Sequence, residues 1–152
     1  MGDRDLIAHL RHHGLKATPQ RHLICQLIAA NPAAHPTAEM IYEQAVQVMP
    51  TMSRKTIYTT VNELAEIGAV RLTRLGTEPL RVDMTLTPHA HGVCRRCGKV
   101  VDIPLGSDWT PDGVESGTHF HVESCEVVYQ GLCSSCCRNL VGSGVLKESG
   151  KE

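Results

Sequence analysis

The sequence is poor in aromatic side chains, with one Trp, one Phe and three Tyr among 152 residues. Its cores must therefore be built mainly from Leu, Ile and Val. It also has almost no excess of charge of either sign, because it contains 15 Lys and Arg and 16 Asp and Glu, which gives a net charge of −1. This balance excludes attraction of a nucleic acid by bulk charge, so any DNA binding must depend on a local patch.

Long apolar runs are absent as well. No stretch approaches the length of a membrane-spanning helix, and the first residues, Met1 to Leu6, lack the apolar core of a signal peptide. We therefore expect a protein without a membrane segment that stays in the cytoplasm, where thiols are kept reduced. In that compartment the seven cysteines favour metal ligation over a disulfide framework.

Local start and stop signals divide the first half into four predicted helices. Thr18-Pro19 is a capping residue followed by proline at the first helical position, and Ser53 can cap another helix. The helices are expected to start near Arg4 and after Thr18, Thr37 and Ser53, and to end before Gly14, Asn31, Pro50 and Gly68. After the fourth helix, apolar residues tend to recur at every second position. This spacing predicts strands around residues 70–72 and 80–84, separated by a turn at 76–79. Helices followed by such a hairpin make a winged helix-turn-helix.

Beyond the hairpin the strand pattern continues over residues 92–103 and 120–132. Between them, residues 106–117 are rich in Gly, Pro, Ser and Asp and predict a loop with little regular structure. Residues 141–152 predict a disordered tail.

The strongest local motif is a pair of CxxC sequences. Four thiolates suit tetrahedral Zn²⁺, and a two-residue spacer at a turn lets both sulfurs of a pair face one point. The four predicted ligands are Cys94, Cys97, Cys133 and Cys136. A redox dithiol or a set of unrelated thiols remains possible from spacing alone.

The remaining cysteines are less informative. Cys137 directly follows the second pair and could compete as the fourth ligand. Cys25 is expected to be a small core residue, and Cys125 is unassigned.

Two His-x-His pairs are present. On a strand, residues two apart point the same way, so His89 and His91 could meet one ion, although a solvated loop pair has the same sequence. His119 and His121 have the same spacing and are expected to lie on the surface or behind the ligands of a metal site.

The fourth predicted helix presents long cations, hydroxyls and an amide opposite its apolar stripe. These groups suit phosphate and base-edge contacts in a major groove, and Arg71, Arg74 and Arg81 of the hairpin would add to them. An ordinary solvated helix has a similar composition, but the helix-turn-helix context favours a DNA reader. The predicted DNA-contacting residues are Arg54, Lys55, Tyr58, Thr59 and Asn62.

Taken together, these segments resemble the ferric uptake regulator (Fur) family, in the family's order from about residue 10 to 137. No single stretch is specific, but the ordered set is. The matching stretches are Gly14-Leu-Lys-Ala-Thr-Pro-Gln-Arg21, His35-Pro-Thr-Ala-Glu39, Ser53-Arg-Lys-Thr-Ile-Tyr58, His89-Ala-His91, Cys94-Arg-Arg-Cys97-Gly98-Lys-Val-Val-Asp102 and Tyr129-Gln-Gly-Leu-Cys133-Ser-Ser-Cys136.

The resemblance implies an α+β fold. An N-terminal winged helix-turn-helix domain, residues 1–83, would be followed by a small α/β dimerisation domain with the zinc site, residues 84–140. It further implies a homodimer on double-stranded DNA with a palindromic operator. It also implies a regulatory site for Fe²⁺ or Mn²⁺, whose nitrogen and oxygen ligands suit these ions. Those ligands would be His35, Asp83, His89, His91 and Asp102.

Two details favour the peroxide-responsive branch of the family. Asp102 and Asp83 stand where iron-uptake regulators usually carry Glu, and Pro88 and Ala90 cannot provide the second metal site of many iron regulators. The chain departs from the family at Thr59-Thr60 of the reading helix and in the loop of residues 106–117.

The predicted function is therefore a metal-dependent repressor that is not an enzyme. Fe²⁺ holds the DNA-binding state, and peroxide reacting at the iron oxidises His35 or His89 and releases the DNA. The nearest alternative is a repressor that responds to a divalent metal without ligand oxidation. Alternatives from other classes are a CxxC thiol-disulfide oxidoreductase and a zinc-stabilised interaction module.

Overall fold

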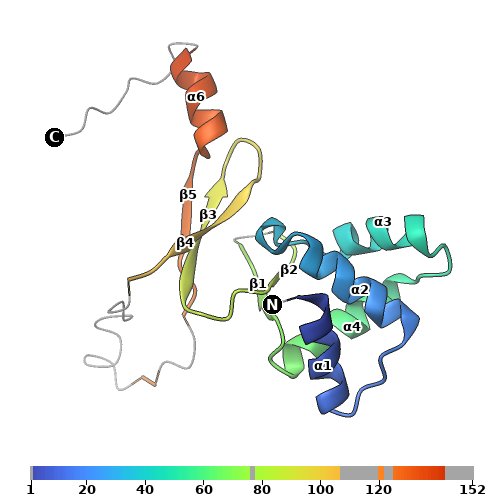
Figure 1. The fold of residues 1–152 in the computed structure, drawn as a ribbon. Coiled ribbons are helices and arrows are strands. Elements are labelled where there is room, and N and C mark those ends of the chain that lie inside the picture. Colours follow the sequence, from blue (N-terminus) through green and yellow to red (C-terminus); the bar gives the residue numbers. More distant parts are fainter. Residues whose placement is uncertain (1, 76–77, 107–119, 122–124, 143–152) are drawn as a thin grey trace. The chain divides into compact units, whose positions relative to one another are not determined.

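The computed structural model describes residues 2–75, 78–106, 120–121 and 125–142. The chain divides into two compact units, residues 1–87 and residues 88–152. Each unit is described by itself below (Figure 1).

The first unit begins with the four helices that the sequence predicts. Three of them start at a hydroxyl side chain that accepts a hydrogen bond from the backbone N–H three residues on, namely Thr18, Thr37 and Ser53 at 3.3, 3.2 and 3.1 Å. The elements are α1 (Asp3–His12), α2 (Pro19–Ala30), a 3₁₀ turn η1 (Pro32–Ala34), α3 (Ala38–Val48) and α4 (Arg54–Glu66). Gly14 and Gly68 have φ values of 75° and 70° after α1 and α4, as predicted for helix ends.

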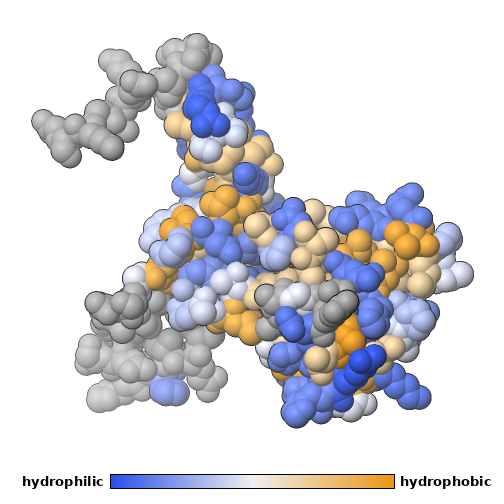
Figure 2. Space-filling model, in the orientation of Figure 1, coloured by the Kyte–Doolittle hydropathy of each residue, from blue (hydrophilic) through white to orange (hydrophobic). Residues whose placement is uncertain are grey.

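The inner faces of these helices share one hydrophobic core. The predicted stripe of α4, which is Ile57, Val61 and Leu64, is buried in it, and Cys25 of α2 is fully buried there, as expected for a small core residue. The outer surface of the helices in view is mainly polar, with smaller apolar patches (Figure 2). The core therefore fixes which face of α4 remains outside.

The predicted hairpin follows α4. Strands β1 (Arg71–Thr73) and β2 (Arg81–Asp83) are antiparallel, with Arg71 opposite Asp83. Residues 76–77 of the predicted turn lie outside the described residues. β2 also contacts the segment before α3, where the Val82 N–H donates to the Pro36 carbonyl oxygen at 2.9 Å. The wing and the start of α3 are thereby joined by backbone hydrogen bonds.

The second unit contains a three-stranded sheet with one following helix. Its elements are β3 (His89–Cys94), β4 (Val100–Pro104), β5 (Val128–Gly131) and α6 (Ser134–Gly142). β3 is the central strand, with β4 antiparallel and β5 parallel to it (Figure 1). The parallel pairing places the end of β5 beside the end of β3, with Gly131 opposite Cys94.

Several predicted bounds in this unit are wrong. β3 begins at His89, ahead of the expected start at Gly92, so it includes both members of the His-x-His pair. The described part of residues 120–132 is strand only over Val128–Gly131. Helix α6 was not predicted, and it ends at Gly142, two residues into the expected tail.

The other predictions for this half concern residues that are mostly not described. Residues 107–117 of the predicted loop and residues 143–152 of the predicted tail lie outside the described residues, and the domain boundary at residue 83 stays a prediction. Within the described residues, no helix combines the length and the apolar character that crossing a membrane requires.

Candidate metal centres and nucleic-acid interface

The four predicted zinc ligands converge at one end of the sheet in the second unit. Cys94 ends β3, Cys97 lies in the turn before Gly98, and Cys133 and Cys136 lie directly before and within α6. The two CxxC motifs are far apart in the sequence, and the pairing of β5 with β3 brings them together. All four Sγ atoms lie within 4.8 Å of one another, and those of Cys97 and Cys133 are 3.7 Å apart. Tetrahedral Zn²⁺ with Zn–S bonds of about 2.3 Å needs sulfurs about 3.8 Å apart, so the donor set fits zinc.

The thiols of this cluster differ in acidity. Backbone hydrogen bonds from Cys133 and then from Cys97 lower the pKa of Cys94 to about 6. Burial, with the neighbouring thiols as a further cause, raises the pKa of Cys136 to about 12. Cys94 is therefore a thiolate at neutral pH while Cys136 keeps its proton, so binding of a metal releases a proton from the site.

The other cysteines stand outside this cluster. Cys137 is half-buried beside Cys136 and is not one of the four sulfurs that lie together. Cys125 is exposed. Because the two CxxC pairs meet each other, neither is an isolated dithiol of the kind that an oxidoreductase uses.

In the first unit, His35 and Asp83 form a fully buried pair. His35 follows η1, Asp83 ends β2, and His35 Nε2 lies 3.8 Å from Asp83 Oδ1. His35 Nδ1 lies 3.1 Å from the Ala33 carbonyl oxygen, which can only accept, so Nδ1 carries the proton and Nε2 offers its lone pair. The Thr85 N–H donates to Asp83 Oδ1 at 2.7 Å and holds the carboxylate in place.

In the second unit, His89, His91 and Asp102 form another group. His91 faces Asp102 across the β3–β4 pair, and His89 lies two residues away on the same side of β3. The Nε2 atoms of His89 and His91 are 3.0 Å apart, and Asp102 Oδ1 lies 3.7 and 4.0 Å from them. His89 and His91 are buried, which rules out a pair of solvated loop histidines.

Both groups have distances that a hard or borderline cation requires. Ligands about 2.1 Å from one ion lie about 3.0 Å apart at right angles and about 4.2 Å apart when opposite. The separations of 3.0 to 4.0 Å within the two groups fall in this range. Imidazole nitrogen and carboxylate oxygen without sulfur suit Fe²⁺ or Mn²⁺. That the two groups share one ion stays a prediction.

The outer face of α4 carries the predicted DNA-contacting side chains. All five are exposed: Arg54, Lys55, Tyr58, Thr59 and Asn62. Arg54, however, already has partners on α3. Its guanidinium binds both carboxylate oxygens of Glu39 at 2.6 to 3.1 Å and lies 4.0 Å over the Tyr42 ring. The hydrogen bond from Arg54 lowers the pKa of Glu39, so a phosphate must compete with a carboxylate for this arginine.

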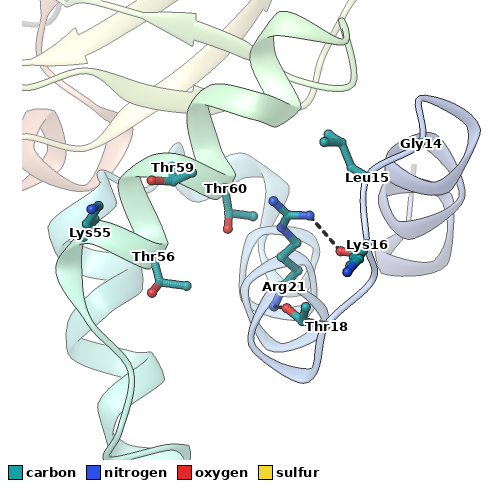
Figure 3. Close-up of a pocket in the computed structure, with 9 residues that line it drawn as sticks. All are labelled: Gly14, Leu15, Lys16, Thr18, Arg21, Lys55, Thr56, Thr59 and Thr60. Atoms are coloured by element: carbon teal, nitrogen blue, oxygen red, sulfur yellow. Dashed lines mark hydrogen bonds between the residues drawn. The ribbon is translucent and has the colours of Figure 1, made fainter.

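A cleft of about 540 Å³ beside α4 adds residues that sequence reasoning missed. Figure 3 shows it between the segment after α1, the start of α2 and one face of α4. It is lined by Lys16, Lys55, Arg21 and several threonine hydroxyls, and Arg21 already binds the Glu63 carboxylate and the Lys16 carbonyl oxygen. Neither α2 nor α4 has an acidic residue in its first turn, so their N-terminal ends favour anions. The sequence signal for these residues is the stretch from Gly14 to Arg21, in which two cations, Lys16 and Arg21, flank the capping residue Thr18.

Comparison with known proteins identifies relatives. A family model described as the ferric uptake regulator family matches residues 12–130. The chain is 32% identical over 136 residues to the peroxide operon regulator of Bacillus subtilis, covering 89% of this chain and 93% of that protein. It is 33% identical over 133 residues to the peroxide-responsive repressor PerR of Staphylococcus saprophyticus, covering 87% and 89%.

Solved structures of similar proteins share the fold. The ferric uptake regulator of Helicobacter pylori matches with a TM-score of 0.66 and 17% identity over 90% of this chain and 95% of that one. The Campylobacter jejuni peroxide stress regulator matches with a TM-score of 0.59 and 26% identity, covering 84% and 96%. The predicted fold class, a winged helix-turn-helix followed by a small α/β domain, is confirmed.

Proposed function

The chain belongs to the ferric uptake regulator family, and on that premise we propose that it is a metal-dependent, homodimeric DNA-binding repressor that responds to peroxide. It is a transcription regulator and not an enzyme, which removes the thiol-disulfide oxidoreductase alternative. The dimeric state and a palindromic operator belong to the proposal, as does the cytoplasm, whose reducing conditions keep metal-binding thiols available.

The observation that carries the proposal is the burial of three imidazoles, those of His35, His89 and His91, and of the Asp83 carboxylate, in two groups with ligand spacing. Fully buried ionisable side chains are costly unless they are paired or bind a metal. We propose that one Fe²⁺ or Mn²⁺ is shared by His35 and Asp83 of the first unit and His89, His91 and Asp102 of the second. An ion held by both units selects one angle between them, so metal binding favours one DNA-binding geometry of the dimer.

Structural zinc is the second part of the proposal. Cys94, Cys97, Cys133 and Cys136 would hold it, and its support is the match of the sulfur spacing to tetrahedral coordination. A closed four-sulfur site leaves no open position for a substrate, so its role would be to keep the sheet and α6 folded.

DNA would bind along the outer face of α4 and the adjoining cleft. Lys55 belongs to both surfaces and is exposed, whereas Arg54 is already neutralised by Glu39. We expect Lys55→Ala to weaken binding of all DNA sequences similarly and to reduce the slope of log affinity against log salt by about 1. Fluorescence anisotropy at several salt concentrations measures both quantities. Arg138→Ala on α6 removes the same charge in the other unit and should leave both unchanged; equal effects of the two variants would contradict this interface.

The peroxide response is proposed from the aspartates and from the relatives. Asp83 and Asp102 stand where iron-uptake regulators usually carry glutamate, and two relatives above 30% identity are peroxide regulators by name. When bound, Fe²⁺ would supply redox catalysis for the reaction of hydrogen peroxide with a ligand imidazole, in which the ring is oxidised by two electrons and gains one peroxide oxygen while the other oxygen leaves as water. His35 and His89 are the proposed targets. A modified imidazole binds metal poorly, so the ion that links the two units would be released.

The test is stoichiometric peroxide added to anaerobic protein loaded with Fe²⁺ or, in parallel, with Mn²⁺. We expect a peptide containing His35 or His89 to gain one oxygen atom, and DNA to be released, only in the Fe²⁺ sample. Peptide mass spectrometry and anisotropy on the same samples measure both changes. DNA release that accompanies thiol oxidation, with both histidines unmodified, would contradict the mechanism.

The alternative is a repressor that responds to a divalent metal without oxidation of a ligand. Its support is the same pair of groups, which would bind the ion reversibly. It predicts that peroxide leaves the histidines intact in both samples and that only chelation releases the DNA.

A further inference from the structure

His35 has an unusual backbone conformation. Its φ of 45° and ψ of 62° place it in the left-handed region, and it is the one described residue other than glycine with a positive φ. A side chain that branches from such a backbone keeps its direction only while the surrounding structure maintains the conformation. The direction of the His35 imidazole therefore depends on contacts made by its backbone.

Arg81 makes such a contact. Its Nη1 donates to the His35 carbonyl oxygen at 3.1 Å, across 46 positions of sequence. The next residue, Val82, donates its N–H to the Pro36 carbonyl oxygen, and Thr37 bridges to Arg81. The wing strand β2 thus holds the backbone on both sides of the peptide bond after His35.

The same strand ends in Asp83, two residues beyond Arg81. His35 Nε2 lies 3.8 Å from Asp83 Oδ1. Strand β2 therefore carries one proposed ligand, Asp83, and binds the backbone of a second, His35, through Arg81. Arg81 itself is half-buried, and its Nε is buried without a hydrogen-bond partner among the described residues. An arginine placed there to contact a phosphate would have its guanidinium in solvent, as Arg74 of the same hairpin is exposed.

We infer that Arg81 is a positioning residue for the regulatory metal, which it affects by holding the His35 carbonyl and so aiming Nε2 at the ion shared with Asp83. This role is an alternative to the predicted contribution of Arg81 to the DNA-contacting cations of the hairpin. The inference rests on the proposed function, because it requires a metal at His35. Its prediction concerns metal affinity in the absence of DNA.

The experiment compares Mn²⁺ binding to the full-length, zinc-containing wild type, Arg81→Met, Arg81→Lys and Arg71→Met. Arg71 is the matched control, because it lies on the paired strand and its side chain also donates to a backbone carbonyl, that of Leu86. We expect Arg81→Met to weaken Mn²⁺ binding about 10- to 100-fold, as loss of a residue that orients a ligand does. Arg81→Lys, which keeps a cationic donor, should recover part of this loss, and Arg71→Met should bind like the wild type.

A second measurement separates positioning from other roles. At saturating Mn²⁺, Arg81→Met should bind DNA as tightly as the wild type, because the metal site is then filled. Weaker DNA binding at saturation would show a phosphate contact or general loss of structure and overturn the inference. Unchanged Mn²⁺ affinity in Arg81→Met would overturn it too. A wild type without any exchangeable metal would overturn the proposed function and this inference with it.

Discussion

Replacing Cys94 with serine is expected to abolish zinc retention and to unfold the sheet and α6 while the four helices of the first unit remain folded. The reason is the distribution of the hydrophobic core. The main core cluster ends at Met84, and the buried apolar residues described beyond it are Ala90, Cys94, Val100 and Cys136. A core of this size supplies little stability to the second unit unless a bound metal or another cross-link adds to it. Structural zinc contributes about 10–16 kcal/mol in zinc-finger peptides, which exceeds what these side chains provide.

Zinc content per chain and hydrogen exchange resolved by peptide measure the two parts of this result. We expect less zinc and fast exchange over β3, β4 and β5 in Cys94→Ser, with slow exchange preserved in α2 and α4. Cys125→Ser is the control, because Cys125 is exposed and outside the four-sulfur cluster. A Cys94→Ser protein that keeps one zinc and a protected β3 would contradict the structural role.

The helices could be predicted because their signals are local. Thr18, Thr37 and Ser53 each bond to an N–H three residues on, so the sequence itself contains both partners of the cap. Helix α6 was missed because its first residues, Ser134-Ser-Cys-Cys, have only intermediate helix propensity. Its start follows Cys133, a proposed zinc ligand, and that relationship appears only in the folded chain, where the four cysteines lie together.

The candidate sites could be predicted as sets of residue types but not as geometry. The spacing of two CxxC pairs indicated four sulfur ligands, whereas the parallel pairing of β5 with β3 that joins them is a long-range contact. The partners of Arg54 and Arg81 lie 15 and 46 positions away in the sequence. The sequence alone therefore does not show that both arginines have partners within the protein.

Loss of the proposed ligands of the regulatory metal is the other change with a large expected effect. We expect Asp83→Ala combined with His89→Ala to bind DNA weakly at any metal concentration, while the wild type binds tightly with Mn²⁺ and weakly with chelator. Moving a two-state equilibrium from 1:99 to 99:1 requires about 10⁴-fold preference of the ligand for one state. An ion that has lost two of its proposed ligands cannot supply that preference. His121→Ala, an exposed histidine outside both groups, is the control.

The single variants decide whether the two groups share one ion. Asp83 belongs to the group of the first unit and His89 to that of the second. If both hold the same ion, each single change already removes most of the metal-dependent DNA affinity, and the second change adds little. If each group holds its own ion, the wild type binds two exchangeable ions per chain, each single variant keeps one, and the two losses add. A double variant that still bound its operator tightly in chelator would show that DNA binding needs neither ion.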